Sequence, residues 1–279
     1  MSGPGARDDT GAMVPIPARV SRVVSLVPSL TETVAVTAPG LVAGATDWCT
    51  HPAGLDVPRV RGTKNPDLAA VIALRPDVVL ANEEENRPAD LAALRDAGLP
   101  VWVTVIRTLD EALVSLRRLL TVACQLPAPR WLEAAERVWE AFPPDGPDGP
   151  DRPGAPGRRA VIPIWRRPWM VLGRDTFAGD VLARLGVDNV YAGHSERYPK
   201  IPLDDLLAAG PELVVLPDEP YRFTAADGPE CFPGLPAALV SGRHLTWYGP
   251  SLAEAPGVLA VQLATVSPFR LAGQDGDAP

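Results

Sequence analysis

The chain has 279 residues, of which 46% are hydrophobic and 22% charged, and its formal net charge is −8. This balance is typical of a soluble globular protein, and it excludes the dense basic patches of nucleic-acid-binding proteins and disfavours contact with anionic membranes. Three cysteines are too few, and of the wrong parity, to suggest a disulfide framework. The first 17 residues contain no apolar segment of a secretory signal, and no apolar run reaches the ~20 residues that span a membrane. The sequence therefore predicts a cytoplasmic protein without membrane insertion.

Apolar strands alternate with short helices through the first half of the chain. Strands are predicted at 20–27, 41–46, 78–81 and 101–105. Helices are predicted to open within PSLTET (28–33), to start at 66 and to span 89–98. Ser29 and Asn65 are the predicted N-caps of the first two helices, the second with Pro66 at its first position. This alternation predicts an α/β fold with a parallel sheet covered on both faces.

The second half repeats this order of elements. Strands are predicted at 160–165 and 212–216, and helices over 176–186, capped by Asp175, and over 202–210. Residues 68–84 align without gaps on residues 203–219, with five identities in seventeen positions. The shared order of helix, proline turn, apolar strand and acidic loop predicts two related lobes, joined by helices over 110–125 and 127–142.

The predicted organisation is a disordered leader at 1–19, an N-terminal α/β lobe at 20–109, connecting helices at 110–142, a flexible Pro/Gly loop at 143–159, a C-terminal α/β lobe at 160–270 and a tail at 271–279.

Polar and aromatic side chains gather where the predicted strands end. Glu83, Glu84 and Glu85 follow the strand at 78–81, and Glu219 occupies the equivalent point of the repeat. Ligands of parallel α/β sheets bind beyond the carboxyl ends of the strands, so we expect the loops of both lobes to line one cleft. The candidate ligand-binding residues are Trp48, Lys64, Asn65, Asn82, Glu84, Glu85, Trp165, Arg166, Asp175, Arg197, Tyr198, Glu219, Tyr221, Trp247 and Tyr248.

Two chemistries compete for this cleft. In a binding protein, the aromatic rings stack on the ligand while the charged groups meet its carboxylates, phosphates or amides. In an enzyme, Cys49, His51 and Glu84 hold a divalent metal, or Cys49 is a nucleophile with His51 as its base. Nucleotide motifs of the GxGxxG and P-loop types are absent from the sequence, so no NAD or ATP site of those types is expected.

Several motifs resemble one known family. They are RVVSLVPSLTET, IALRPDVVLA with its counterpart in the second lobe, CTHP, GTKN, ANEEEN, WRRPWM, DTF, RYP, EPYRF and WYG. Over about residues 20 to 268 the chain resembles the helical backbone metal receptors of the class III periplasmic-binding-protein fold, a group that contains the cobalamin-binding proteins of vitamin B12 ABC importers. The motifs resemble most closely a branch without export signals.

The resemblance implies two Rossmann-like lobes with parallel sheets, joined by a helical backbone, with a ligand held between them. The expected ligand is a corrinoid, a metal chelate or another charged small molecule, and cobalamin or a divalent metal is the expected cofactor. Importer receptors dock on their transporter through one glutamate in each lobe. The matching positions are Ala69 and Asp204, so docking on an ABC transporter is not expected.

Overall fold

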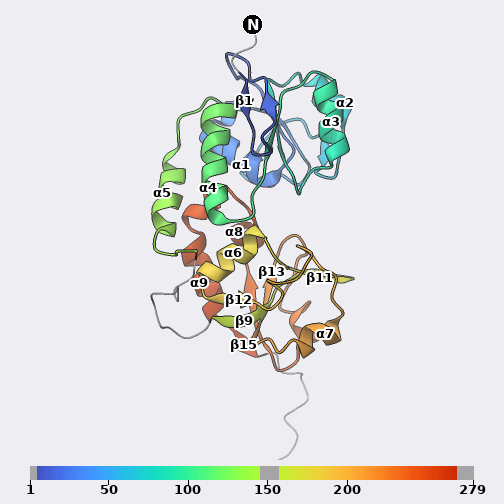
Figure 1. Ribbon diagram of the computed structural model, residues 1–279, viewed down its shortest axis with the longest axis vertical. Coiled ribbons are helices and arrows are strands. Elements are labelled where there is room, and N and C mark those ends of the chain that lie inside the picture. The colour runs from blue at the N-terminus through green and yellow to red at the C-terminus, as the bar shows by residue number, and fades with distance from the viewer. Residues whose placement is uncertain (1–4, 145–156, 269–279) are drawn as a thin grey trace, which may run out of the picture. The chain divides into compact units, whose positions relative to one another are not determined.

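The computed structural model describes residues 5–144 and 157–268 (Figure 1). The chain divides into two compact units, which we call unit 1 and unit 2. Unit 1 contains Met1–Ile106, Asp110–Glu136 and Tyr248–Pro250, and unit 2 contains Arg107–Leu109, Arg137–Trp247 and Ser251–Pro279. The predicted tail at 271–279 and residues 145–156 of the predicted loop lie outside the described residues.

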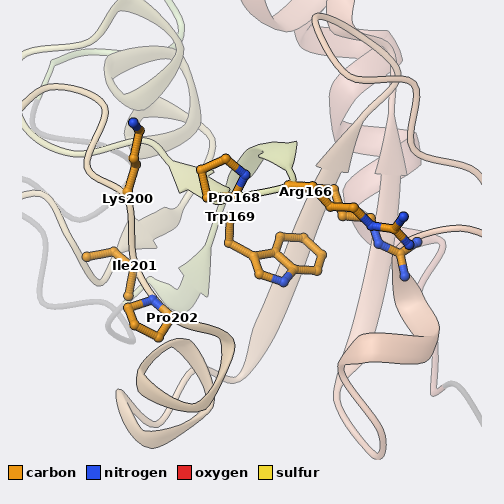
Figure 2. A pocket seen from close by; sticks show the side chains of 7 residues that line it. Arg166, Pro168, Trp169, Lys200, Ile201 and Pro202 are labelled. Carbon is orange, nitrogen blue, oxygen red and sulfur yellow. The ribbon is translucent and has the colours of Figure 1, made fainter.

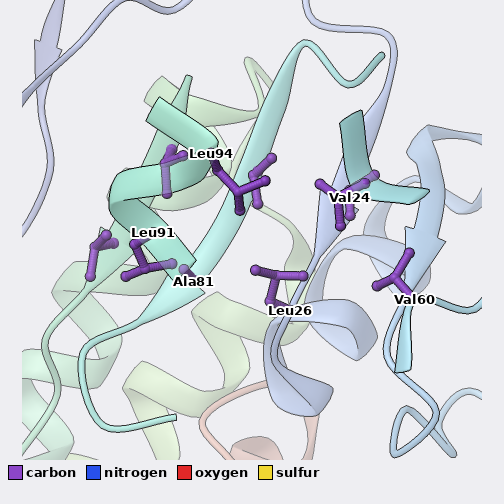
Figure 3. Close-up of a cluster of buried hydrophobic side chains, with 10 residues drawn as sticks. Val24, Leu26, Val60, Ala81, Leu91 and Leu94 are labelled. Carbon is purple, nitrogen blue, oxygen red and sulfur yellow. The ribbon is translucent and has the colours of Figure 1, made fainter. Parts of the chain in front are cut away.

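Unit 1 is built on a four-stranded parallel sheet in the order β4-β3-β7-β8. Its strands are β3 (Val23–Ser25), β4 (Val42–Ala45), β7 (Val78–Asn82) and β8 (Val101–Thr104), and its first helices are α1 (Pro28–Thr37), η1 (Pro39–Leu41), α2 (Leu68–Ala73) and α3 (Pro88–Asp96). Every residue of β7 and β8 is buried, because neighbouring elements cover both faces of the sheet. Figure 3 shows Ala81 of the sheet beside Leu91 of α3, and Val24 near Val60, in one buried hydrophobic cluster.

Three helical segments follow unit 1's sheet along the chain. They are α4 (Leu109–Arg118), the π-helical turn η2 (Leu119–Ala123) and α5 (Arg130–Trp139). They correspond to the predicted connecting helices at 110–142, with α4 beginning one residue earlier. The boundary between the units crosses both α4 and α5.

The prediction of a disordered leader is wrong for residues 5–19. A hairpin of β1 (Ala6–Arg7) and β2 (Met13–Val14) forms there, and its turn carries Asp8. The Asp8 carboxylate accepts hydrogen bonds from the Thr10 amide at 2.9 Å, the Thr10 hydroxyl at 2.6 Å and the Val103 amide at 3.2 Å. The bond from Val103 joins residues 95 positions apart, so local composition could not reveal it.

Unit 2 contains a five-stranded sheet in the order β12-β9-β13-β14-β15. The strands are β9 (Arg158–Val161), β12 (Val187–Asn189), β13 (Leu213–Pro217), β14 (Pro236–Val240) and β15 (Ser267–Pro268), of which only β15 runs antiparallel to its neighbour among the described residues. The helices are α6 (Phe177–Arg184), α7 (Leu203–Ala208), η3 (Pro229–Cys231), α8 (Gly242–Thr246), η4 (Pro250–Ala253) and α9 (Ala255–Ala264). The predicted α/β architecture with a parallel sheet in each half is confirmed.

Two small hairpins extend the units beyond their sheets. β5 (Arg61–Gly62) pairs with β6 (Asn65–Pro66) in unit 1, and β10 (Pro163–Arg166) pairs with β11 (Trp169–Val171) in unit 2. Both hairpins carry residues that the sequence singled out as ligand-binding.

The predicted helix caps are displaced by one or two residues. Asp67, and not Asn65, caps α2 by accepting the Ala70 amide at 3.0 Å. Thr176, and not Asp175, caps α6 by accepting the Gly179 amide at 3.2 Å. Helix α1 begins at Pro28 with no side-chain cap, so Ser29 lies inside the helix. In the part of the chain that the structure describes, none of the helices has the length and apolar character needed to cross a membrane.

Candidate functional site

The acidic loop after β7 is held in place by Asn82, whose side chain is 1% exposed. Its amide nitrogen donates to the Thr104 carbonyl at 3.2 Å and to the Thr104 hydroxyl at 3.0 Å. Its amide oxygen accepts from the backbone amides of Glu84 at 2.9 Å and Glu85 at 3.2 Å. Asn82 therefore turns the chain sharply at the end of a buried strand and fixes the two carboxylate-bearing residues that follow.

A second asparagine joins the acidic loop to the β5–β6 hairpin. The Asn86 amide nitrogen donates to the carbonyls of Thr63 at 3.0 Å and Leu26 at 3.3 Å, and its oxygen accepts from the Asn82 amide at 2.9 Å. At the tip of the hairpin, the Lys64 ammonium donates to the Glu84 carbonyl. The predicted residues Lys64 and Glu84, twenty positions apart, are thereby brought together.

An exposed tryptophan completes this group of side chains. Trp48 follows β4 and is 67% exposed. A Cβ atom placed on Gly62 would lie 2.5 Å from Asn65 Oδ1 and 3.2 Å from the Trp48 indole nitrogen, so glycine at this position lets both side chains approach the hairpin. We call Trp48, Lys64, Asn65, Glu84 and Glu85 the unit 1 cluster.

The charges of the unit 1 cluster act on one another. Burial raises the pKa of the half-buried Glu85 carboxyl, the Lys64 ammonium opposes this rise, and the Glu84 carboxylate adds to it. The balance favours the protonated form, so the folded protein holds the Glu85 proton more tightly than the unfolded chain does.

Substituting glutamine for Glu85 should therefore stabilise the protein near neutral pH. The Glu85 carboxyl makes stability fall as the pH rises from its ordinary pKa of 4.5 through the raised value, because the folded state must then ionise a desolvated group. Thermal unfolding should show Glu85→Gln melting about 2 °C higher than the wild type above this window and equal to it below pH 4.5.

The exposed Glu140 supplies the control for this experiment. Glu140→Gln should leave the pH dependence of the melting temperature unchanged. A melting temperature of Glu85→Gln below that of the wild type at neutral pH would contradict the prediction.

The predicted metal set of Cys49, His51 and Glu84 is not assembled. The Cys49 side chain is buried, and its sulfur lies 3.1 Å from each of the Thr31 and Thr46 hydroxyls. The His51 Nδ1 atom instead lies 3.0 Å from the Thr50 hydroxyl. No group of three His, Cys, Asp or Glu side chains able to hold a metal occurs among residues 5–144 and 157–268.

The physical reason is a turn that the sequence pattern did not reveal. The Cys49 amide donates to the Thr46 carbonyl at 3.2 Å, so the segment is not extended and the thiol points into unit 1. A thiol at this place serves neither as a metal ligand nor as the nucleophile of a Cys–His pair.

In unit 2, Glu219 and Trp247 form a hydrogen-bonded pair. The Trp247 indole nitrogen donates to the Glu219 carboxylate at 2.8 Å, and the tryptophan is buried. The Gly242 amide donates to the Asp218 carboxylate at 2.6 Å, and a Cβ on Gly242 would lie 2.6 Å from the Glu219 backbone nitrogen. The loop after β13 is thus packed against the start of α8. The equivalent loop of the repeat, after β7, is instead held by the Asn82 side chain.

Arg166 is neutralised inside unit 2. Its side chain is 15% exposed, and its guanidinium pairs with the carboxylates of Asp227 and, at 2.5 Å, Glu230. These two acids were missed from the sequence because they lie in an irregular segment without periodicity. The Tyr221 hydroxyl donates to Asp227 at 2.7 Å, and the edge of its ring meets Trp165, which is 43% exposed, with 5.6 Å between ring centroids.

The remaining predicted residues lie apart from these pairs. The Arg197 Nε atom donates to the Asp175 carbonyl at 2.9 Å, and the Arg197 guanidinium lies 5.9 Å from the centroid of the Tyr198 ring. Tyr248 is buried and belongs to unit 1, whereas its neighbour Trp247 belongs to unit 2. Whether the predicted residues of both units share one ligand stays a prediction.

Solved structures with the same fold cover nearly all of the chain. The periplasmic vitamin B12 binding protein BtuF of Vibrio cholerae matches 88% of this chain and 97% of its own, with a TM-score of 0.67 and 16% identity. CeuE of Helicobacter pylori with Ni(II) bound matches 92% of this chain and 88% of its own, with a TM-score of 0.74 and 15% identity. The chain has the class III periplasmic-binding-protein fold. The periplasmic heme-binding protein BhuT shows the same fold, with a TM-score of 0.68 and 24% identity over 87% of this chain and 97% of its own.

Sequence comparison finds relatives that are vitamin B12-binding proteins. The vitamin B12-binding protein of Pectobacterium carotovorum is 24% identical over 256 residues, which are 88% of this chain and 90% of the relative. The vitamin B12-binding protein of Salmonella typhi is 24% identical over 198 residues, which are 70% of this chain and 71% of the relative. No family model matches the chain.

These comparisons contradict the predicted cytoplasmic location. BtuF and BhuT are both described as periplasmic proteins. The prediction rested only on the composition of the first 17 residues.

Proposed function

We propose that the protein is a receptor that binds a corrinoid or a similar planar metal chelate through its strand-end loops. The observation that carries this proposal is the unit 1 cluster, in which an exposed tryptophan lies against the β5–β6 hairpin and the lysine of that hairpin contacts the loop with two glutamates. Trp48 is 67% exposed, so its indole surface is accessible to a ligand. The relationship to vitamin B12-binding proteins over 88% of the chain supports a corrinoid as the ligand.

Each side chain of the unit 1 cluster has a proposed role. The Trp48 indole provides a flat apolar surface for a macrocycle. The Lys64 ammonium meets a carboxylate or phosphate of the ligand, and the Glu84 and Glu85 carboxylates accept hydrogen bonds from its amide groups. In unit 2, the exposed Trp165 ring is the corresponding candidate for stacking.

A planar chelate is favoured over a bare metal ion. Among the described residues no three metal-ligating side chains gather, whereas the aromatic surface suits a macrocycle that brings its own metal. A Cys49-dependent enzyme is not proposed, because the thiol is buried between two threonine hydroxyls.

We also propose a location outside the cytoplasm, which the periplasmic relatives support. Docking on a transporter through paired acids is not proposed. Ala69 and Asp204 are both exposed and both stand second in their helices, α2 and α7, so only one of the two positions offers a carboxylate.

Titration calorimetry with cyanocobalamin, hemin and a nickel–histidine chelate tests the proposed function. Cyanocobalamin should bind, and Trp48→Ala should weaken its binding about tenfold, because the stacking surface is removed. Trp131→Ala is the control. This half-buried tryptophan of α5 donates its indole N–H to the Thr37 hydroxyl at 3.0 Å, and its replacement should leave the affinity unchanged. The proposal fails if none of the three compounds binds, or if Trp48→Ala binds cyanocobalamin as tightly as the wild type.

A further inference from the structure

Arg59 donates hydrogen bonds into the loop that carries Trp48. Its Nη1 atom donates to the Thr46 carbonyl at 2.9 Å and to the Cys49 carbonyl at 3.0 Å, and its Nη2 atom donates to the Leu55 carbonyl at 3.0 Å. These carbonyls come from the start, the middle and the later part of the segment that follows β4. One guanidinium therefore ties together three points of a single loop.

The backbone of Arg59 is fixed at the carboxyl end of β4. The Ala45 amide donates to the Pro58 carbonyl at 3.1 Å, and the Val60 amide donates to the Ala45 carbonyl at 3.0 Å. Ala45 and Arg59 thus form a parallel bridge, and both Ala45 and Val60 are buried. The Arg59 side chain therefore starts from a rigid position at the base of the loop.

The residues on either side of Trp48 are held as well. The Asp47 amide donates to the Arg61 carbonyl at 2.9 Å, and the buried Cys49 thiol lies between two threonine hydroxyls, each at 3.1 Å. Because the Trp48 side chain is 67% exposed, its own packing fixes the indole only in part. The direction of the indole is set mainly by the loop backbone, which Arg59 contacts on both sides of Trp48.

Arg59 is used differently from Arg166 of unit 2. Arg166 lies beside Trp169, with 5.8 Å between its guanidinium and the ring centroid (Figure 2). It pairs with the carboxylates of Asp227 and Glu230, whereas no ion pair joins Arg59 to an acidic side chain of the described residues. The donors of Arg59 go to backbone carbonyls, and its planar fork reaches three of them at once. This arginine therefore shapes the chain and does not balance a charge.

We propose that Arg59 is a positioning residue, which holds the Trp48 indole in the orientation that stacks on the ligand. The inference rests on the proposed receptor function, in which Trp48 supplies the stacking surface. A side chain that is ordered before binding loses less conformational entropy when the ligand arrives, so preorganisation raises the affinity without a new contact. Arg59 then contributes to the affinity only through Trp48.

Fluorine NMR of the full chain labelled with 5-fluorotryptophan tests this proposal without any ligand. The Trp48→Ala variant identifies the Trp48 resonance among those of the seven tryptophans. Arg59→Met, which keeps an unbranched side chain but has no donor, should narrow the Trp48 resonance and move it toward that of free 5-fluorotryptophan, because the indole then moves more freely. A Trp48 resonance that Arg59→Met leaves unchanged would overturn the proposal.

Arg22→Met is the matched control for this substitution. Arg22 is also an exposed arginine of unit 1, and its Nε and Nη2 atoms donate to the Leu74 carbonyl at 3.1 Å and 2.8 Å. Its replacement removes the same kind of hydrogen bond and should leave the Trp48 resonance unchanged. Arg59→Lys, whose donors share one nitrogen, replaces Arg59→Met if circular dichroism shows that the latter does not fold.

A double-mutant cycle measured by cyanocobalamin calorimetry is the second arm of the test. Arg59→Met should weaken binding about fivefold in the wild-type background and less than about twofold in the Trp48→Ala background. Arg22→Met should leave binding unchanged in both. Equal losses in the two backgrounds would overturn the proposal, because Arg59 would then act without Trp48. If cyanocobalamin, hemin and the nickel–histidine chelate all fail to bind, the receptor function falls, and the fluorine spectra alone decide whether Arg59 positions Trp48.

Discussion

Replacing Asp8 by alanine should lower the free energy of unfolding by about 3 kcal/mol, the larger part of it from amide groups left unpaired. The carboxylate is buried and accepts hydrogen bonds from Thr10, from the Ala12 amide at 3.1 Å and from the Val103 amide at 3.2 Å. Its second oxygen also lies 3.8 Å from the Arg95 guanidinium. Urea unfolding followed by circular dichroism measures the loss as a shift in the midpoint.

Asp96→Ala is the matched control for this substitution. Asp96 is an exposed aspartate at the end of α3, and its removal should change the free energy of unfolding by less than about 0.5 kcal/mol. Equal unfolding midpoints for Asp8→Ala and Asp96→Ala would show that the N-terminal hairpin contributes nothing to stability.

Replacing Asn82 by alanine should cost about 3 kcal/mol of stability and should also weaken ligand binding. The substitution leaves the amides of Glu84 and Glu85 without their acceptor, and Thr104 without its donor. The acidic loop then loses the turn that fixes its carboxylates. Urea unfolding measures the first effect, and cyanocobalamin calorimetry measures the second.

The control is Asn65→Ala, which removes the same side chain from an exposed position in β6. It should change stability by less than about 0.5 kcal/mol. If Asn82→Ala unfolds at the wild-type urea concentration, the hydrogen bonds of its side chain do not hold the acidic loop.

The sheets were predictable because their strands are continuous apolar runs. The predicted strand at 78–81 corresponds to β7 (Val78–Asn82), and that at 101–105 corresponds to β8 (Val101–Thr104). The aligned segments 68–84 and 203–219 both form a helix followed by a buried strand, α2 with β7 and α7 with β13. A strand buried on both faces tolerates few polar residues, so its apolar run can be recognised in a single sequence.

Helix starts and the N-terminal hairpin were less predictable. Asn65 and Asp67 are both good capping residues, and the pairing of β5 with β6 selects Asp67 by placing Asn65 in a strand. The N-terminal segment was predicted to be disordered from its composition, which does not record its contacts with distant strands. The partner that buries Asp8 is a backbone amide 95 residues away.

The sequence predicted the residues of the candidate site but not which of their side chains are exposed. Strand-end reasoning found the acidic loop and Glu219, and the structure joins Lys64 to the acidic loop and places Trp48 and Asn65 close to Gly62 of the same hairpin. Strand-end reasoning could not predict that Asn82, Cys49 and Trp247 are buried. Burial of a loop residue depends on which distant segments cover it, and a single sequence carries no record of those contacts.

The N-terminal hairpin covers an edge of the unit 1 sheet that could otherwise pair with another copy of the chain. β8 is the outermost strand of the unit 1 sheet, and an outermost strand offers unpaired backbone groups to any other chain. Here the Asp9 amide donates to the Val103 carbonyl at 3.2 Å, while the side chains of Asp8 and Asp9 accept the amides of Val103 and Val105. Two carboxylates thus occupy positions where a foreign strand would dock. The hairpin β1–β2 therefore covers the β8 edge and hinders strand-to-strand aggregation, a role that its composition does not indicate.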